Sequence, residues 1–163
     1  MGFELIRNDL WRQFGASIEM LENAISFCPN SFWEADDEFW YISYHTVFWL
    51  DYYLTLEPLR FSPPKPYTLS EFNPSGEKPP RKYRKEELLE YLNLSKQKCH
   101  QLILNLTLEK ANARWVNEYK NYSVFEILAY NMRHVQHHTA QLNYILRQKI
   151  NDAPKWVSVA KTI

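Results

Sequence analysis

Prolines are concentrated in one part of this chain, and their position restricts where helices can form. Seven of the nine prolines lie between residues 57 and 84: Pro58, Pro63, Pro64, Pro66, Pro74, Pro79 and Pro80. Proline removes the amide donor that a helix needs, so residues 57–84 are expected to form an extended connector. Ordered loops of such length usually cover a site or an interface.

Outside this connector, four long segments place apolar residues at helical spacing. We expect helices from Phe3 to Ile25 (stopping near Pro29), from Asp37 to Leu56 with Asp36 as the N-cap, from Lys85 to Leu106, and from the capping-box sequence Ser123-Val-Phe-Glu126 to Ile150. Only three residues are glycine, which favours helices over a turn-rich β fold. The expected fold is all-α: one domain over residues 1–163, built as a four-helix bundle whose second and third helices run parallel because the connector is long.

Charge and composition exclude several classes of protein. The 19 basic and 19 acidic residues cancel, so no net field attracts nucleic acid or an anionic membrane. Two cysteines, Cys28 and Cys99, do not make a disulfide framework. No apolar run approaches the ~18 residues of a membrane span, and the N-terminus lacks a signal-peptide pattern. The expected location is the cytoplasm, with no membrane partner.

Histidines supply the clearest functional signal. His134 and His138 are four residues apart on the expected last helix, so both imidazoles project from one face. A transition metal accepts this spacing from a single helix, and the isolated His45 could supply a third ligand. Such a site leaves coordination positions open, as catalytic sites do. Two alternatives stay open: the pair lies on a solvated surface, or His45 is an ordinary hydrogen-bonded histidine.

The neighbours of these histidines are the candidates for supporting the ligands or contacting a substrate. Asn131 and Gln141 share the inward face of the last helix, although simple polarity of that face would explain them equally well. His45 shares its face with an aromatic group, Tyr41, Trp49 and Tyr52. His137 lies about 60° from His134, on the side away from His138, and is not expected to converge with them.

Other kinds of active site fit the sequence poorly. A di-iron centre of the ferritin type is disfavoured because no Glu-x-x-His pair occurs. A zincin peptidase is disfavoured because valine, not glutamate, follows His134. Cys99 and His100 are adjacent on a helix and point about 100° apart, so they make a weak nucleophile–base pair.

Two of these segments resemble motifs of a known family. The segment from Arg133 to Leu142 resembles the His-x-x-His-His-x-x-Gln-Leu signature on the last helix of the DinB/YfiT-like superfamily, and residues 44–50 are similar to its second-helix histidine segment. The resemblance implies a four-helix bundle of up-down-down-up topology, frequently dimeric. It also implies that nickel or zinc is bound by His45, His134 and His138.

The chain departs from the family pattern at one place, and the family narrows the function only in part. The family often has Arg-Gly before the glutamine, where this chain has Thr139-Ala140; the ligand positions are unaffected. Members with an assigned reaction resemble thiol-dependent transferases, isomerases or hydrolases, in which a thiol such as bacillithiol or mycothiol is thought to bind the metal.

By resemblance, the chain is therefore expected to be a homodimeric, metal-dependent transferase or hydrolase that uses a low-molecular-weight thiol. No carboxylate is evident as a general base. The alternative is a dimeric helical bundle that binds a metal or ligand without catalysis.

Overall fold

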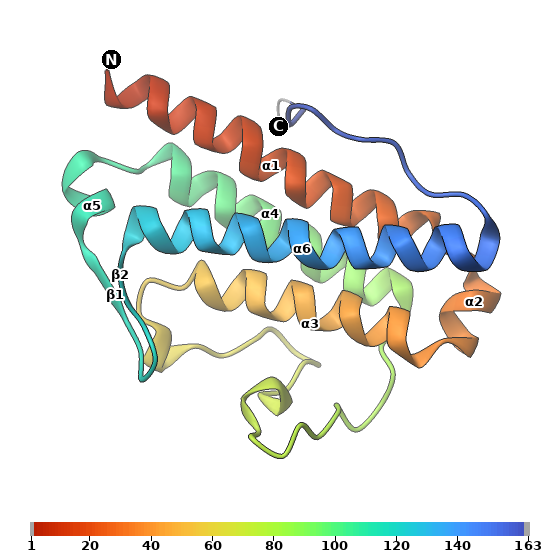
Figure 1. Cartoon of the computed structure of the whole chain (residues 1–163). Helices are drawn as coiled ribbons and strands as arrows, with labels where there is room; N and C mark the ends of the chain where they lie inside the picture. The colour runs from red at the N-terminus through yellow and green to blue at the C-terminus, as the bar shows by residue number, and fades with distance from the viewer. Residues whose placement is uncertain (1, 162–163) are drawn as a thin grey trace.

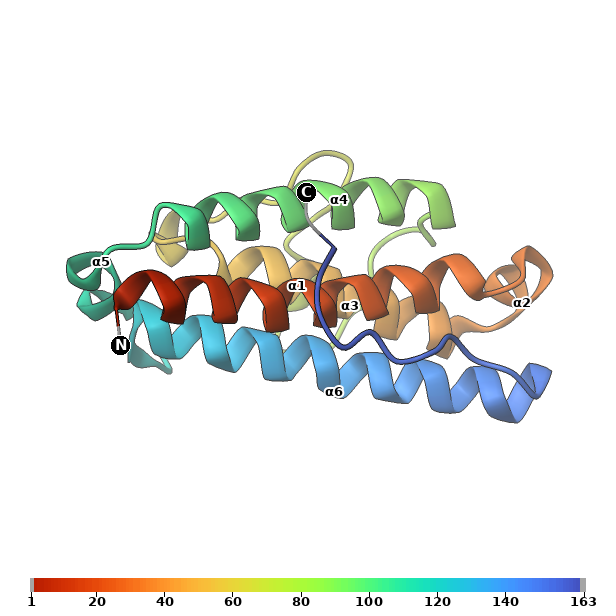
Figure 2. The ribbon, with the colours of Figure 1, turned by 90° about the horizontal axis from the view of Figure 1, so that it is seen from above.

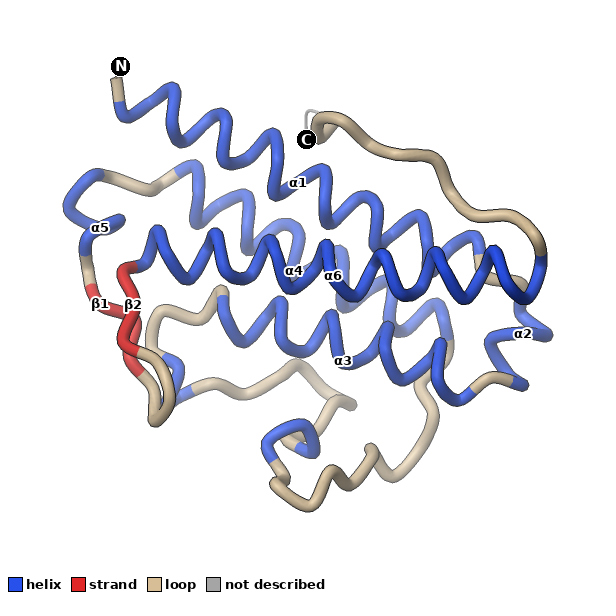
Figure 3. Tube along the Cα trace, in the orientation of Figure 1, coloured by secondary structure: helices blue, strands red, loops and turns tan. Residues whose placement is uncertain are grey.

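The computed structural model of the protein describes residues 2–161 and is mainly helical. In this range the helices are α1 (Phe3–Phe27), α2 (Asn30–Ala35), α3 (Asp37–Tyr53), α4 (Lys85–Leu104), α5 (Leu108–Asn112) and α6 (Val124–Ile150). Strands β1 (Arg114–Val116) and β2 (Asn121–Ser123) form a small antiparallel hairpin, visible in Figure 3. The all-α expectation therefore holds apart from this hairpin. Among residues 2–161, no helix combines the length and apolarity that crossing a membrane requires.

Four long helices lie side by side and position the rest of the chain. Figure 1 shows α1 and α6 running in one direction and α3 and α4 in the opposite direction. Helix α6 packs against both α1 and α3, and α4 packs against the same two helices. The view from above in Figure 2 shows the same four helices aligned along one axis. The second and third long helices thus run parallel, and the connector of residues 57–84 spans the distance between them.

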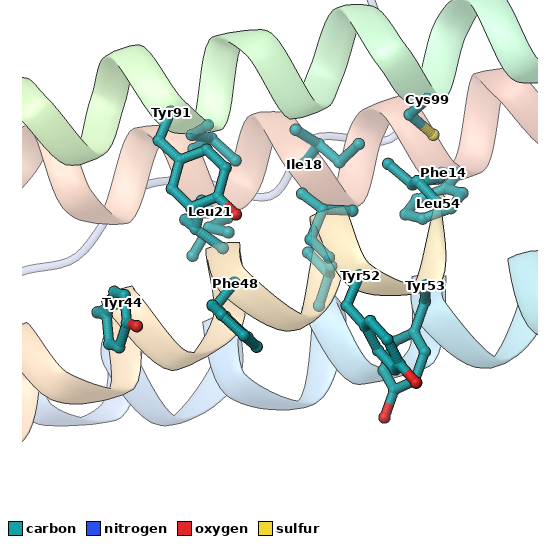
Figure 4. Close-up of a cluster of buried hydrophobic side chains, with 14 of the residues drawn as sticks. Phe14, Ile18, Leu21, Tyr44, Phe48, Tyr52, Tyr53, Leu54, Tyr91 and Cys99 are labelled. Carbon is teal, nitrogen blue, oxygen red and sulfur yellow. The ribbon is translucent and has the colours of Figure 1, made fainter. Parts of the chain in front are cut away.

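The core consists of apolar stripes that the four helices present to one another. On α1 the buried residues at helical spacing are Leu10, Phe14, Ile18, Leu21 and Ile25. Figure 4 shows Phe14, Ile18 and Leu21 between the helix ribbons, with Tyr91 of α4 nearby. Burial of such side chains contributes roughly 1.5–3 kcal/mol each, so this stripe fixes α1 against its neighbours.

The two predicted N-caps are confirmed. Asp36 accepts hydrogen bonds from the amides of Glu38 and Phe39 at the start of α3. Ser123 accepts one from the amide of Glu126 at the start of α6. Each cap satisfies amides that have no partner within the helix, so the starts of both histidine-bearing helices follow from local sequence.

The predicted helix ends extend too far in two places. Helix α3 ends at Tyr53 rather than Leu56, where the amide of Leu54 bonds the carbonyl of Asp51 in a tighter turn. Pro58 also disfavours helical backbone at the residue before it. Helix α4 ends at Leu104 rather than Leu106, where the amide of Leu106 bonds the carbonyl of Ile103 in a tighter turn.

Three short elements were not predicted: α2, α5 and the hairpin. Helix α2 is held by Trp33, which is 1% exposed and donates from its indole to the carbonyl of Tyr83. The hairpin is held by Trp115, which is fully buried and donates to the carbonyl of Thr55. Both anchors are long-range contacts, which a periodicity of a few residues does not reveal.

The connector contains no α-helix, as predicted, but it is folded against α3. Tyr67 and Tyr83 are buried, and the hydroxyl of Tyr67 donates to the carbonyl of Glu87. The Tyr44 hydroxyl of α3 donates to the carbonyl of Thr68 at 3.4 Å. These contacts place the 3₁₀ turn Ser70–Phe72 beside the middle of α3.

After α6 the chain reverses and runs back across α1, as Figures 1 and 2 show. The amide of Ala160 donates to the carbonyl of Arg12, and that of Lys161 donates to Glu19. Gly15 permits this approach, because a Cβ atom there would lie 2.6 Å from the Cβ of Ala160. The C-terminal tail (residues 151–161) is therefore packed on α1 at this point.

Candidate metal centre

Three imidazoles meet where α3 packs against α6. His45 comes from the middle of α3, and His134 and His138 come from successive turns of α6. One ligand nitrogen from each residue lies within 4.8 Å of the other two. The structure thus brings together the three histidines that the sequence singled out, and this group could hold a metal ion.

The closest pair of nitrogens matches the spacing of a metal site. Nε2 of His45 and Nε2 of His134 are 3.4 Å apart. Two ligands at about 2.0–2.1 Å from a tetrahedral zinc ion lie roughly 3.3–3.4 Å from each other. An ion between these nitrogens would replace one long contact with two coordinate bonds, so the residues present fit a transition metal.

The tautomer of His45 is set by Glu71, which lies in the 3₁₀ turn of the connector. Nδ1 of His45 donates to Oε2 of Glu71 at 2.6 Å, and the Trp49 indole donates to the same oxygen at 2.9 Å. Burial raises the pKa of Glu71, but the hydrogen bonds that it accepts, above all from His45, outweigh burial and lower the pKa. The carboxylate is therefore ionised, and because it accepts from Nδ1 of His45, Nε2 is the His45 nitrogen that faces the metal site.

Gln141 performs the same task for His138. Nδ1 of His138 donates to the side-chain oxygen of Gln141 at 2.6 Å, which leaves Nε2 as the ligand atom. Burial lowers the pKa of His138, and this outweighs the opposite effect of the Gln141 contact. The imidazole is thereby kept in the neutral form that a metal requires.

His134 is partly buried, like the other two histidines of the group. Burial, followed by the neighbouring imidazoles of His138 and His45, lowers the pKa of His134 to about 3. Its ring packs edge-on against Tyr53, with ring centroids 5.9 Å apart. His134 is therefore neutral at physiological pH, and its Nδ1 has no hydrogen-bond partner among residues 2–161.

Of the other candidate residues, two lie against His45 and two lie farther away. The rings of Tyr41 and Trp49 are 6.3 and 6.1 Å from the His45 ring. Tyr52 is one ring farther out, packed edge-on against Trp49 at 5.3 Å. Asn131 is buried and donates to the carbonyl of Leu50 at 3.0 Å, so it ties α6 to α3 one turn before His134.

The remaining histidines and cysteines lie outside the group. The His137 ring is 4.9 Å from that of His138, but His137 is not part of the cluster. His100 packs on Trp11, with centroids 4.5 Å apart. Cys28 and Cys99 are buried free thiols, and burial raises the pKa of both. Neither cysteine is poised as a nucleophile.

Glu71 is the residue of the metal centre that the sequence did not reveal. Its side chain is only 3% exposed, although it lies in a proline-rich segment where carboxylates are ordinarily solvated. The only feature of the sequence that pointed to this segment was the length of the connector, since long ordered loops often cover a site.

Together, the fold and the site define a mainly helical protein with a three-histidine group that could hold a metal. Three neutral nitrogens leave the charge of a divalent cation intact. His45 is 29% exposed, so the group is reached from solvent. Comparisons with protein-family models, with curated proteins and with solved structures found no match for this chain.

Proposed function

We propose that this protein is a metal-dependent enzyme of the DinB/YfiT-like superfamily, a thiol-dependent transferase or hydrolase that acts on small molecules. The observation that carries the proposal is the convergence of His45, His134 and His138, with two of the three rings oriented by Glu71 and Gln141. The arrangement of the long helices supports the family's four-helix bundle with up-down-down-up topology.

In this proposal the site holds nickel or zinc, both of which accept imidazole. When bound, the cation supplies Lewis acidity, which lowers the pKa of a small-molecule thiol or a water molecule beside it. The chain's own residues bring three imidazole nitrogens within 4.8 Å of one another, and burial lowers the pKa of His134 and His138, which keeps protons off both. The proposal includes a homodimer in the cytoplasm; the two free cysteines suit a reducing compartment.

Metal content tests this function directly. Untagged protein is expected to contain about one transition metal per chain by elemental analysis. His45→Ala and His138→Ala should lose it, whereas His100→Ala, whose ring packs on Trp11 outside the cluster, should retain it. Protein that is metal-free and cannot be loaded with zinc or nickel would overturn the proposal.

Turnover separates catalysis from the non-catalytic alternative. The loaded protein is expected to accelerate the reaction of a small thiol with an electrophile, and His45→Ala should abolish this rate. A bound metal without turnover and without an exchangeable ligand would assign the site a structural role. Sedimentation analysis tests the homodimer separately.

A further inference from the structure

A surface hollow of about 550 Å³ lies where three parts of the chain meet: α3, the connector, and the turn between β1 and β2 (residues 117–120). Figure 1 shows the hairpin tip beside the first part of the connector. None of the three histidines of the metal group lines this hollow, so it is separate from the metal centre. We call it the aromatic hollow, because its lining includes Trp49, Tyr52, Tyr53, Phe61, Leu69 and Phe72.

Both sides of the aromatic hollow are fixed to α3 by hydrogen bonds. On the hairpin side, the Asn117 side chain donates to the hydroxyl of Tyr52 at 3.0 Å. On the connector side, the Trp49 indole donates to the carboxylate of Glu71 at 2.9 Å. Figure 4 shows Tyr52 directed away from the core of the bundle, towards this side of α3. The hollow is therefore formed before a ligand arrives, and binding does not require its walls to become ordered.

Large apolar side chains around the aromatic hollow are exposed. The exposed fraction is 48% for Leu69, 39% for Phe72, 85% for Leu59 and 80% for Tyr119, and all four residues line the hollow. Apolar residues that are exposed singly are ordinary on a protein surface. Four of them around one concave site leave apolar area that a ligand would remove from water.

The rings of the hollow favour a flat aromatic ligand. Phe72 packs edge-on against Tyr52 and Trp49, with ring centroids 4.9 and 5.5 Å apart. Because Phe72 is still partly exposed, its ring can make a further contact of the same kind.

The charged groups of the lining do not favour a charged ligand. Its one ammonium, Lys120, is accompanied by the carboxylates of Glu71 and Glu118, so an anion gains little attraction. The Glu71 carboxylate is almost fully buried and already accepts hydrogen bonds from His45 and Trp49, so it is not free to bind a cation.

From this geometry we propose that the aromatic hollow binds an uncharged, flat aromatic small molecule. Its volume falls in the range of small-molecule sites, roughly 300–1,000 Å³. A protein partner would instead cover a broad surface of roughly 800 Å². The proposed site is additional to the metal centre and does not depend on the metal-dependent function.

The test uses 2-naphthol and decahydro-2-naphthol, which share a carbon skeleton and a hydroxyl group, although only the first is flat and aromatic. Binding to ¹⁵N-labelled protein is followed through the indole signals, once with zinc added and once with a chelator present. 2-Naphthol is expected to bind about tenfold more tightly in both conditions. The Trp49 signal should shift to saturation, whereas that of Trp156, which is 69% exposed in the C-terminal tail, should not.

Two variants of the hollow and one matched control locate the site. Phe72→Leu keeps an apolar side chain but removes the ring, so it should reduce the preference for 2-naphthol. Leu69→Gln should weaken 2-naphthol binding by about threefold, because an apolar contact is lost. Leu94→Gln should leave binding unchanged, because Leu94 is 49% exposed on α4, outside the hollow. If Phe72→Leu fails to fold, the comparison of Leu69→Gln with Leu94→Gln decides.

The contrary results are equally specific. Equal affinity for the two probes, or an undiminished preference in a folded Phe72→Leu variant, would overturn the proposal. Shifts without saturation at both indoles would mean non-specific adsorption, and binding that requires zinc would place the probe at the metal; either result also overturns it. Binding that persists with chelator supports the hollow even where zinc fails to bind, an outcome that defeats only the metal-dependent function.

A second copy of the chain is the remaining occupant that the experiment can reveal. If neither probe binds, and sedimentation shows a dimer that Leu69→Gln dissociates but Leu94→Gln does not, the hollow is part of an interface between copies. That result would overturn the small-molecule site.

Discussion

The Glu71 carboxylate lies between the His45 imidazole and the Trp49 indole and accepts hydrogen bonds from both. A histidine that ligates a metal is usually oriented in this way through its second nitrogen. Because Glu71 is almost fully buried, its contact with His45 is not weakened by solvent as a surface ion pair is.

We therefore expect Glu71→Gln to bind zinc about tenfold more weakly than the wild type, and Glu71→Ala up to about a hundredfold more weakly. Glutamine keeps an oxygen acceptor for Nδ1 of His45 but loses the charge. The measurement is competition for zinc with a chromophoric chelator. Glu57→Gln, which alters an exposed carboxylate paired with Arg60, should bind as the wild type does; equal affinity in all variants would contradict the role of Glu71.

The lowered pKa of His134 predicts how the metal-free protein responds to acid. The unfolded chain takes up a proton near pH 6.5, whereas folded His134 does so only near pH 3. The free energy of unfolding should therefore fall as the pH drops through this window, by at most about 1.4 kcal/mol per pH unit from this group. Urea denaturation with chelator present, between pH 6.5 and 5, measures the slope.

His134→Leu should reduce that slope, because the imidazole whose pKa burial lowers to about 3 is then gone, although His138, whose pKa burial also lowers, remains. His137→Gln retains His134 and should keep the wild-type slope. If His134→Leu were as acid-sensitive as the wild type, the origin of the acid response would lie elsewhere.

Among the residues of the metal centre, the sequence predicted best those that are close together along the chain. His134 and His138 share a helix, so their separation alone places them together. His45 is 89 residues from His134, so the sequence could offer it only as a candidate third ligand, to which the resemblance to a family added support. Glu71 could not be predicted, because only the folded path of the connector brings it to His45.

At the scale of the elements, the start of α3 determines where His45 lies along the helix. Asp36 satisfies two amides of the first turn. Asp36→Ala is expected to lower the free energy of unfolding by about 1 kcal/mol, measured by urea denaturation. Asp9→Ala removes an exposed carboxylate within α1 and should change stability far less; a loss as large in Asp9→Ala would argue against a capping effect.

Helix starts were predictable because a cap is a contact between residues two or three apart in sequence. Helix ends were less so: α3 stops early where the carbonyl of Thr55 accepts a hydrogen bond from Trp115 of the hairpin. The hairpin itself has three residues in each strand, too few for an alternating pattern to stand out.

On the scale of the whole molecule, the C-terminal tail depends on the absence of a side chain at Gly15. Gly15→Ala is expected to displace the tail, because the new Cβ would overlap Ala160 at 2.6 Å. Limited trypsin digestion should then cut at Lys155 faster than in the wild type. The double variant Gly15→Ala/Ala160→Gly removes the overlapping atom and should restore the wild-type rate. Failure to do so would mean that the faster cleavage does not arise from overlap with Ala160 but from another neighbour such as the Trp11 ring, 3.1 Å from the same Cβ.

The separation of His45 from His134 also has a consequence for the order of events during synthesis. A ribosome that has delivered α3 and the connector has already produced His45 and Glu71, but the other two imidazoles belong to the last long helix. Until α6 emerges and docks on α3, the nascent chain presents only one of the three nitrogens. The three-histidine group can therefore capture an ion only after α6 has been made and has docked on α3.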